Sequence, residues 1–203
     1  MEQIKQYEYV DLGLPSGLKW AKCNVGATSE TDYGYYFQWG DIEDKSNSDC
    51  SWKTYEYCNG TYNTLTKYCT NSSYGTVDNK TTLESVDDAA RVHMGGDWRM
   101  PTRDEFRELF DYTNNEWISN YNGTVVNGRK FTSKTNGNSI FIPASGYRLG
   151  SSFRGQGSGG DVWSSSLNAI LPGGALELGF GSGSIYMGDS GRYYGLAVRG
   201  VMD

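Results

Sequence analysis

Two pairs of carboxylates are the residues whose types and spacing could support acid–base catalysis. Asp87-Asp88 and Asp104-Glu105 are candidates for the pair of acids that hydrolyses a glycosidic bond. Both pairs fall where helices are expected to begin, and carboxylates there are favoured by the positive end of the helix dipole. We therefore expect these carboxylates to cap helices. A hydrolase that uses a pair of acids is the least favoured of the functions considered below.

Other catalytic chemistry lacks the side chains that it needs. His93 is the only histidine, which argues against a Ser-His-Asp triad and against a zinc cluster. It falls on the inner side of a predicted helix, and we expect it to be a core residue. The run Gly155–Gly160 lacks the Lys-Ser/Thr of a phosphate-binding loop, and no dense acidic loop indicates calcium. We expect no catalytic residue, no metal and no cofactor, and thus a protein that is not an enzyme.

Two helices are expected in the middle of the chain. Ser85 and Asp88 mark the start of the first, and Gly95-Gly96 mark its end. The second begins with Thr102 and Glu105 spaced as a capping box, in which side chain and backbone amide exchange hydrogen bonds. One apolar face follows, made of Phe106, Leu109 and Phe110, and Asn114-Asn115 are expected to stop this helix.

Strands are expected on both sides of these helices. Residues 7–23 read as one hairpin, and residues 129–133 and 139–143 as a second, around Asn136-Gly137-Asn138. Residues 34–40 form an aromatic segment that we expect to be buried, and the polar residues 41–80 read as a surface insertion. The fold class predicted for the single domain 1–203 is α+β, with both ends of the chain in one sheet.

Composition and charge limit the classes of partner that the protein can have. The net charge of −6 and the pI near 4.9 provide no basic stripe for nucleic acid. No apolar run reaches the roughly 20 residues of a membrane span, and the first residues lack the apolar core of a signal peptide. An acidic chain rich in Tyr, Gly and Asn is expected at a cell surface, outside the cell or on a phage virion. The chain has four cysteines, which allow three different disulfide pairings. The sequence leaves open whether any disulfide forms among Cys23, Cys50, Cys58 and Cys69.

The last quarter of the chain has a distinct pattern. Residues 146–203 hold 15 of the 27 glycines and no lysine. Leu176, Leu178 and Phe180 alternate with Glu177 and two glycines, which is the period of a strand with one face inward. The outward positions are a mixture of Gly, Ser, Asp, Glu and Tyr, which is typical of a contact surface.

Several motifs carry a resemblance that spans nearly the whole chain apart from the insertion. The run Tyr9–Ala21 and the run Gly96–Thr102, with Glu105, resemble the fibrobacter major-paralogue domains of Bacteroides-type bacteria and their phages. Those domains have the C-type-lectin fold in its formylglycine-generating-enzyme-like branch. The resemblance implies two helices packed on short, mostly antiparallel sheets with long loops.

The C-terminal frame is similar to the variable region of diversity-generating retroelement target proteins. It consists of Gly146-Tyr147-Arg148, Trp163–Ser166 and Gly195–Arg199. In that family, adenine-specific errors rewrite selected codons, often those of Asn, and the fold displays the products on a ligand-binding surface. Residues 146–203 contain one Asn, Asn168, as expected of a rewritten copy. Gln156 and Glu177 cannot arise from an Asn codon changed only at its adenines.

The resemblance implies a set of ligand-binding residues at outward or loop positions. They are Phe153, Arg154, Gln156, Ser158, Asp161, Ala169, Ile170, Leu171, Glu177, Tyr186, Asp189, Ser190, Tyr193 and Tyr194. The inward set is Trp163, Phe180, Ile185, Met187, Leu196 and Val198.

Three functions follow from the residues and the resemblance. The first is a non-catalytic binding protein with a hypervariable surface for a surface protein or a glycan. The second is a carbohydrate-binding or adhesin module of fixed specificity, whose aromatic rings stack on sugars. The third is the acid-pair hydrolase. The cysteine pair of formylglycine-generating enzymes and the sugar-binding motifs of calcium-dependent lectins are missing from the sequence, so neither activity is implied.

Overall fold

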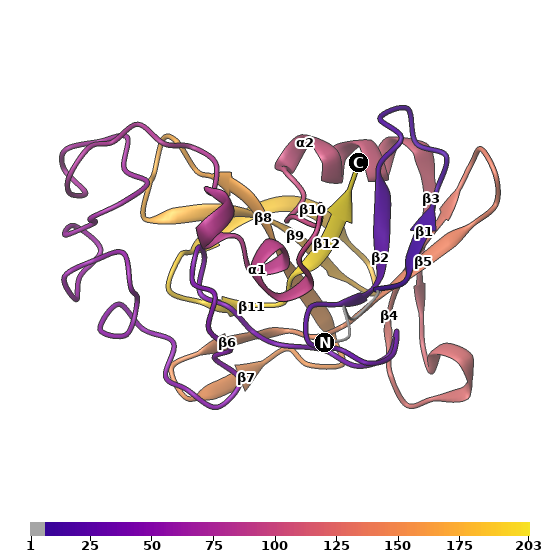
Figure 1. The fold of residues 1–203 in the computed structure, drawn as a ribbon. Coiled ribbons are helices and arrows are strands. Elements are labelled where there is room, and N and C mark those ends of the chain that lie inside the picture. Colours follow the sequence, from indigo (N-terminus) through magenta and orange to yellow (C-terminus); the bar gives the residue numbers. More distant parts are fainter. Residues whose placement is uncertain (1–6) are drawn as a thin grey trace, which may run out of the picture.

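A computed structural model describes residues 7–203, and its strands form four three-stranded antiparallel sheets (Figure 1). The first sheet joins the two ends of the chain, in the order β1 (Tyr9–Asp11), β2 (Lys19–Asn24) and β12 (Arg199–Met202). The amide of Gly17 donates to the carbonyl of Leu14 at 2.9 Å and closes the turn between β1 and β2. The predicted N-terminal hairpin and the meeting of both termini in one sheet are confirmed.

The second sheet contains a strand that the sequence did not indicate. β4 (Gly128–Ser133) and β5 (Ser139–Pro143) form the predicted hairpin. β3 (Thr113–Ile118) pairs with the other edge of β4. The preceding helix ends at Tyr112, just before the predicted stop at Asn114-Asn115, and the chain runs directly into an extended strand because β4 offers it a ladder of hydrogen bonds.

The third and fourth sheets contain the glycine-rich quarter of the chain. The third has the order β10 (Ile185–Gly191), β9 (Gly174–Gly181) and β8 (Gly159–Leu167). The fourth has the order β11 (Gly195–Leu196), β6 (Tyr147–Leu149) and β7 (Ser152–Arg154). Two bridges, Gly146–Gly160 and Val162–Ala197, join the two sheets.

The helices are short. A 3-10 turn, η1 (Ser85–Asp87), precedes α1 (Ala89–Met94), and a second turn, η2 (Tyr121–Gly123), lies in the loop after β3. α2 (Arg103–Tyr112) begins with the predicted capping box, in which the Glu105 amide donates to Thr102 Oγ1 at 3.3 Å and the Thr102 amide donates to Glu105 Oε2 at 2.7 Å. The extended backbone of Asp88 separates η1 from α1, so the first helix is reduced to six residues.

The predicted α+β class with a C-type-lectin fold is wrong for this structure. Strands make up 37% of the described residues and helices only 11%, so the chain is a β-rich protein built from small antiparallel sheets. The helical signals came from local capping and spacing, which are correct, but Asp88 and the positive backbone angles of Gly95 and Gly96 confine α1 to little more than one turn.

Two apolar clusters hold the sheets together. Phe106 and Leu109 of α2 pack against Trp20, Leu178 and other buried residues of β2, β4, β5, β8, β9 and β12 in one cluster. The other cluster surrounds Trp39 and Trp163 and includes the buried Phe37. Within the aromatic segment at 34–40, Tyr36, Phe37 and Trp39 are buried as predicted, whereas Tyr35 is 38% exposed.

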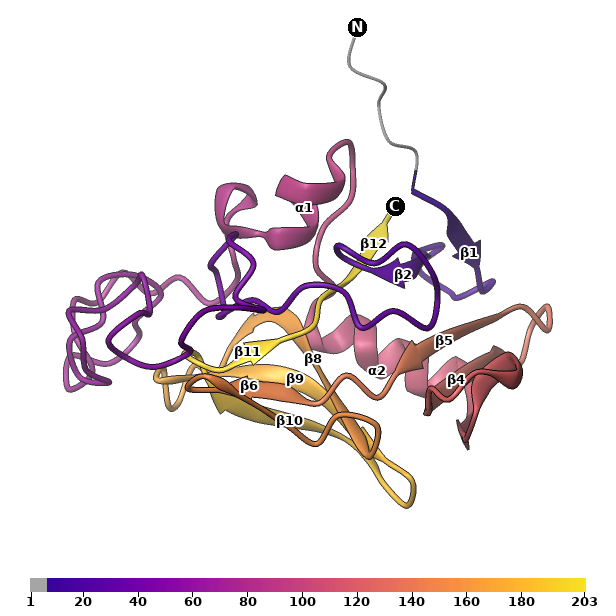
Figure 2. The ribbon, with the colours of Figure 1, turned by 90° about the horizontal axis from the view of Figure 1, so that it is seen from below.

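Residues 41–80 form an irregular segment at one end of the molecule, on the left of both views (Figures 1 and 2). This segment has a small apolar cluster of its own, formed by the buried Tyr55, Leu65 and Cys69. All four cysteines have free thiols. No helix in residues 7–203 is long and apolar enough to cross a membrane.

Candidate ligand-binding surface

The register of β8, β9 and β10 determines which side chains share a face. Asp161, Gly179 and Tyr186 stand side by side across the three strands, and Trp163, Glu177 and Gly188 form the next row. Cross-strand neighbours point to the same side of a sheet. The opposite face carries Val162, Leu178 and Phe180, which are buried against α2. Asp161, Glu177 and Tyr186 therefore lie together on the face that points away from this core.

The predicted inward set is buried or partly buried, but it is divided between the two faces: Trp163 lies on the face of Glu177 and is buried in the cluster around Trp39. Trp163, Phe180, Leu196 and Val198 are buried, and Ile185 and Met187 are partly buried against the cluster around α2. The frame residues are thus core residues.

The first group of predicted ligand-binding residues lies on an exposed hairpin that packs against the rest of the protein at its base. Phe153 and Arg154 belong to β7, and Gln156 and Ser158 follow in the next turn, all with exposed side chains. The guanidinium of Arg148 lies 4.6 Å from the centre of the Phe153 ring, and its two terminal nitrogens donate to the carbonyls of Ser46 and Ser48 at 2.7 Å. The projecting hairpin therefore has a rigid base.

A side chain cannot replace hydrogen at the root of this loop. Gly146 has a φ of +58°, and a Cβ there would lie 2.0 Å from the carbonyl oxygen of Arg154. The glycine lets two backbone segments approach closely and fixes where β7 projects.

The second loop presents apolar side chains to solvent. Ile170 is 82% exposed and Leu171 51%, and Ala169 is also exposed. The amides of Ile170 and Leu171 both donate to Asn168 Oδ1 at 3.1 Å, which fixes the turn. Large apolar side chains held outward in this way are characteristic of binding sites.

Tyr193 and Tyr194 are less accessible than expected. Both are partly buried: Tyr193 packs against Trp52 with ring centres 4.8 Å apart, and Tyr194 stacks on Tyr147 at 5.4 Å. Asp189 is exposed and Ser190 partly so. The two tyrosines therefore pack against other aromatic rings of the protein and offer a ligand only part of their surface.

Glu177 is the clearest departure from the expected exposure. Its side chain lies on the outward face but is only 4% exposed, and Oε2 has no hydrogen-bond partner among the described residues. Burial raises its pKa to about 8, with further contributions from the negative charges of Asp161 and Asp189. Burial also raises the pKa of Asp161 to about 6. Glu177 thus occupies an outward-facing position of β9, as expected, but it is buried there, in a row between Trp163 and Gly188.

The insertion borders this surface, which the sequence did not indicate. Thr70 Oγ1 donates to the carbonyl of Ala169 at 2.7 Å. The backbone of Cys50 forms an isolated β-bridge with that of Gly150. Tyr74 lies close to Gly173, beside the second loop. These contacts join segments far apart in the chain, so no local periodicity could reveal them.

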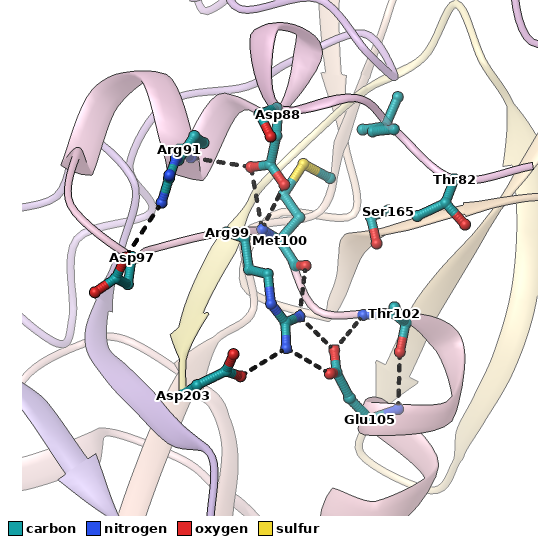
Figure 3. A pocket seen from close by; sticks show the side chains of 12 residues that line it. Thr82, Asp88, Arg91, Asp97, Arg99, Met100, Thr102, Glu105, Ser165 and Asp203 are labelled. Carbon is teal, nitrogen blue, oxygen red and sulfur yellow. Dashed lines mark hydrogen bonds and ion pairs between the residues drawn. The ribbon is translucent and has the colours of Figure 1, made fainter. Parts of the chain in front are cut away.

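The carboxylates considered for catalysis are engaged in structural contacts. Figure 3 shows Asp88, Arg99 and Glu105 lining a cleft beside α1 and α2. Asp88 accepts from the amides of Arg91 and Met100, and Glu105 accepts from both terminal nitrogens of Arg99 at 2.8 and 2.7 Å. Asp88 is the N-cap of α1 and Glu105 is half of the capping box, as predicted.

Asp87 is held by a different part of the molecule from Asp88. Its carboxylate accepts from the hydroxyls of Tyr57 and Tyr68 and pairs with Lys67. Burial opposes ionisation, but these contacts outweigh it and lower the pKa of Asp87. Burial raises the pKa of Asp88 despite the amides that it accepts from. The two carboxylates therefore do not converge on one reacting bond.

His93 also has a structural role. Its ring packs against Tyr35 and Phe37, and Nε2 lies 2.7 Å from the carbonyl oxygen of Ile42. In residues 7–203, no group of three or more His, Cys, Asp or Glu side chains could hold a metal ion.

Comparisons with known proteins gave one finding. The family model described as the Lcl C-terminal domain matches residues 14–201. No curated protein and no solved structure matched the chain.

Proposed function

The chain belongs to the family of Lcl C-terminal domains, and we propose that it is a non-catalytic ligand-binding domain. The observation that carries the proposal is the exposed set Phe153, Arg154, Ile170 and Tyr186, held on a backbone whose other side is core. Large aromatic, aliphatic and Arg side chains supply most binding energy in protein interfaces. The structural engagement of Asp87, Asp88 and Glu105 supports a role without catalysis.

The finer proposal is that a retroelement diversifies this surface. It is supported by a difference in burial between two sets of residues. Arg148, Trp163 and Arg199, which belong to the C-terminal frame, are buried, whereas most of the positions that the resemblance assigns to variation are exposed or partly exposed. Buried frame residues keep the fold while exposed positions change at little cost in stability. A partner at a cell surface, either a protein or a glycan, fits such a display on a cell or a phage particle.

Sequencing the codons for residues 146–199 from the native population tests diversification. We expect substitutions to recur at exposed positions such as Phe153, Ile170 and Tyr186, and to be missing at Trp163 and Arg199. A single invariant sequence would contradict diversification and leave a binding domain of fixed specificity.

Removal of the exposed anchors tests binding itself. We expect the triple variant Phe153→Ala, Ile170→Ala and Tyr186→Ala to bind a partner, isolated by selection against a surface-protein and glycan panel, about 100-fold more weakly. The free energy of unfolding should change by about 1 kcal/mol or less, because these side chains are exposed.

The matched control removes exposed side chains elsewhere. Tyr112 and Val125 are exposed on α2 and in the loop before β4. Their double Ala variant should bind as the parent does. Equal affinity of the triple variant and the parent would refute the assigned surface.

A carbohydrate-binding module of fixed specificity is the second candidate. The exposed rings of Tyr62, Phe153 and Tyr186 favour it, since such rings stack on sugars. Glycan binding that survives the exchange of the positions assigned to variation would support this candidate over the first.

A further inference from the structure

The unpaired carboxyls on the outward face of β8 and β9 point to a particular ligand chemistry. We propose that Asp161, Glu177 and Tyr186 form a subsite for an organic cation, the ammonium or guanidinium group of a lysine or arginine side chain on a protein partner. The proposal rests on the proposed function, because it assigns chemistry to part of the same surface.

The first support is geometric. Asp161 and Glu177 stand in adjacent rows of the same face, on neighbouring strands, with Tyr186 on the third strand. A Cβ at Gly188 would lie 3.5 Å from Glu177 Oε1 and 2.9 Å from a ring carbon of Tyr186. A Cβ at Gly179 would lie 2.5 Å from the Tyr186 ring. Two glycines thus let the ring lie flat across β9 and β10, beside the Glu177 carboxyl.

The second support is an unmet electrostatic requirement. A buried carboxylate is normally paired with a cation or fully hydrogen-bonded. Glu177 Oε2 has neither, and within residues 7–203 no Lys, Arg or His forms an ion pair with Asp161 or Glu177. The groups on β8 and β10 that act on Glu177 are the carboxyls of Asp161 and Asp189, which add negative charge, and the Ser190 hydroxyl. A cation is what this site lacks.

The third support is the aromatic ring. Tyr186 is half exposed, so one face of its ring packs on the glycine floor while the other is open to solvent. A cation beside two carboxyls and over an aromatic face gains both ion pairing and cation–π attraction. Arg fits this setting well, because its planar group stacks on rings and binds carboxylates in a bidentate manner.

Metal binding and anionic ligands fit less well. Only two carboxyls share this face, because Asp189 pairs with Leu176 and so points to the other side of the sheet. The chain carries a net charge of −6, which repels polyanions and attracts basic partners.

Titration with small cations tests the subsite without knowledge of the partner. The probes are n-butylguanidinium and n-butylammonium chloride, followed through the amide NMR signals of Gly179 and Gly188. NaCl, n-butanol and CaCl₂ are the controls for ionic strength, the alkyl chain and a divalent metal. We expect saturable shifts with the two organic cations, and proton release on binding because Glu177 must ionise.

Variants identify the groups responsible. Glu177→Gln should weaken binding of n-butylguanidinium about tenfold or more, and Tyr186→Leu about threefold. Glu116→Gln is the matched control: it makes the same substitution at an exposed position of β3, outside the sheet of β8, β9 and β10, and should change affinity less than about twofold. Because Glu177→Gln replaces a buried ionisable carboxyl with a neutral amide of similar shape, it should fold at least as well as the parent, so lost binding would not reflect misfolding.

Three results would overturn the proposal. They are shifts no larger than those with NaCl or n-butanol, a stronger response to CaCl₂ than to either organic cation, and equal effects of Glu177→Gln and Glu116→Gln. The anchors Phe153 and Ile170 lie outside the subsite, so loss of the cation subsite and loss of ligand binding as a whole are separately measurable.

Discussion

Replacement of Arg192 by methionine is expected to lower the free energy of unfolding by about 3–5 kcal/mol. The guanidinium is fully buried and donates to Tyr55 Oη at 2.7 Å and to the carbonyls of Lys67, Tyr68 and Pro172 at 2.9–3.1 Å. Methionine would leave these acceptors buried without a donor. The rings of Trp39 and Tyr55, about 5 Å from the guanidinium carbon, would also lose a cation.

Denaturant unfolding of the parent and two further variants makes this measurement specific. Arg192→Lys keeps the charge but supplies fewer donors in the wrong geometry, and should fall between the parent and Arg192→Met. Arg154→Met removes an exposed Arg and should change the free energy by less than about 0.5 kcal/mol. A loss below about 1 kcal/mol for Arg192→Met would show that these contacts do not hold the structure together.

The role of Arg192 also explains how the insertion affects the binding surface. Three of its acceptors, Tyr55, Lys67 and Tyr68, belong to residues 41–80, whereas Arg192 itself follows β10. Hydrogen exchange in residues 50–80 should therefore accelerate in Arg192→Met more than exchange in β4 or β5. The insertion is thus attached to the surface from which the ligand contacts project.

Local signals in the sequence predicted the local structure well. The turn at Pro15–Gly17, the hairpin turn at Asn136–Asn138 and the capping box at Thr102 depend on residues within a few positions of one another. The period of two in residues 174–191 also correctly separated the apolar face of β9 and β10 from the other face. Such features carry their cause in the adjacent sequence.

Long-range packing accounts for what the sequence did not predict. β3 forms because β4 is available as a partner, and Arg192 is buried because the insertion supplies carbonyls. Glu177 alternates as an exposed residue would, yet lies beneath its neighbours on the face. The α+β prediction was wrong for a related reason. The local signals for helices did not indicate how large a fraction of the chain would form strands.

The second large effect concerns the dependence of stability on pH. Folding raises the pKa of Glu177 from 4.5 to about 8, chiefly because burial disfavours the charged form. Between these pH values the folded state holds a proton that the unfolded chain has released. The stabilisation is complete below pH 4.5 and is lost as pH rises through about 8. Asp161 acts in the same direction over a lower range, from 3.8 to about 6.

Glu177→Gln should remove most of this dependence. We expect the variant to be more stable than the parent by about 2–4 kcal/mol above pH 8, and the difference to shrink steadily toward pH 4.5. Urea unfolding of both proteins across this pH range measures the difference directly, so that carboxylates with lowered pKa, such as Asp87, cancel.

A parallel course of the two stability curves would mean that Glu177 is solvated or paired in solution. Divergence would mean that the fold maintains an unfavourable carboxyl at neutral pH. Retention of such a group is explained by a functional requirement, since the isosteric Gln would be more stable. The pH range in which Glu177 destabilises the free protein is then the range in which a bound cation stabilises it most, because the cation removes the charge imbalance that burial creates.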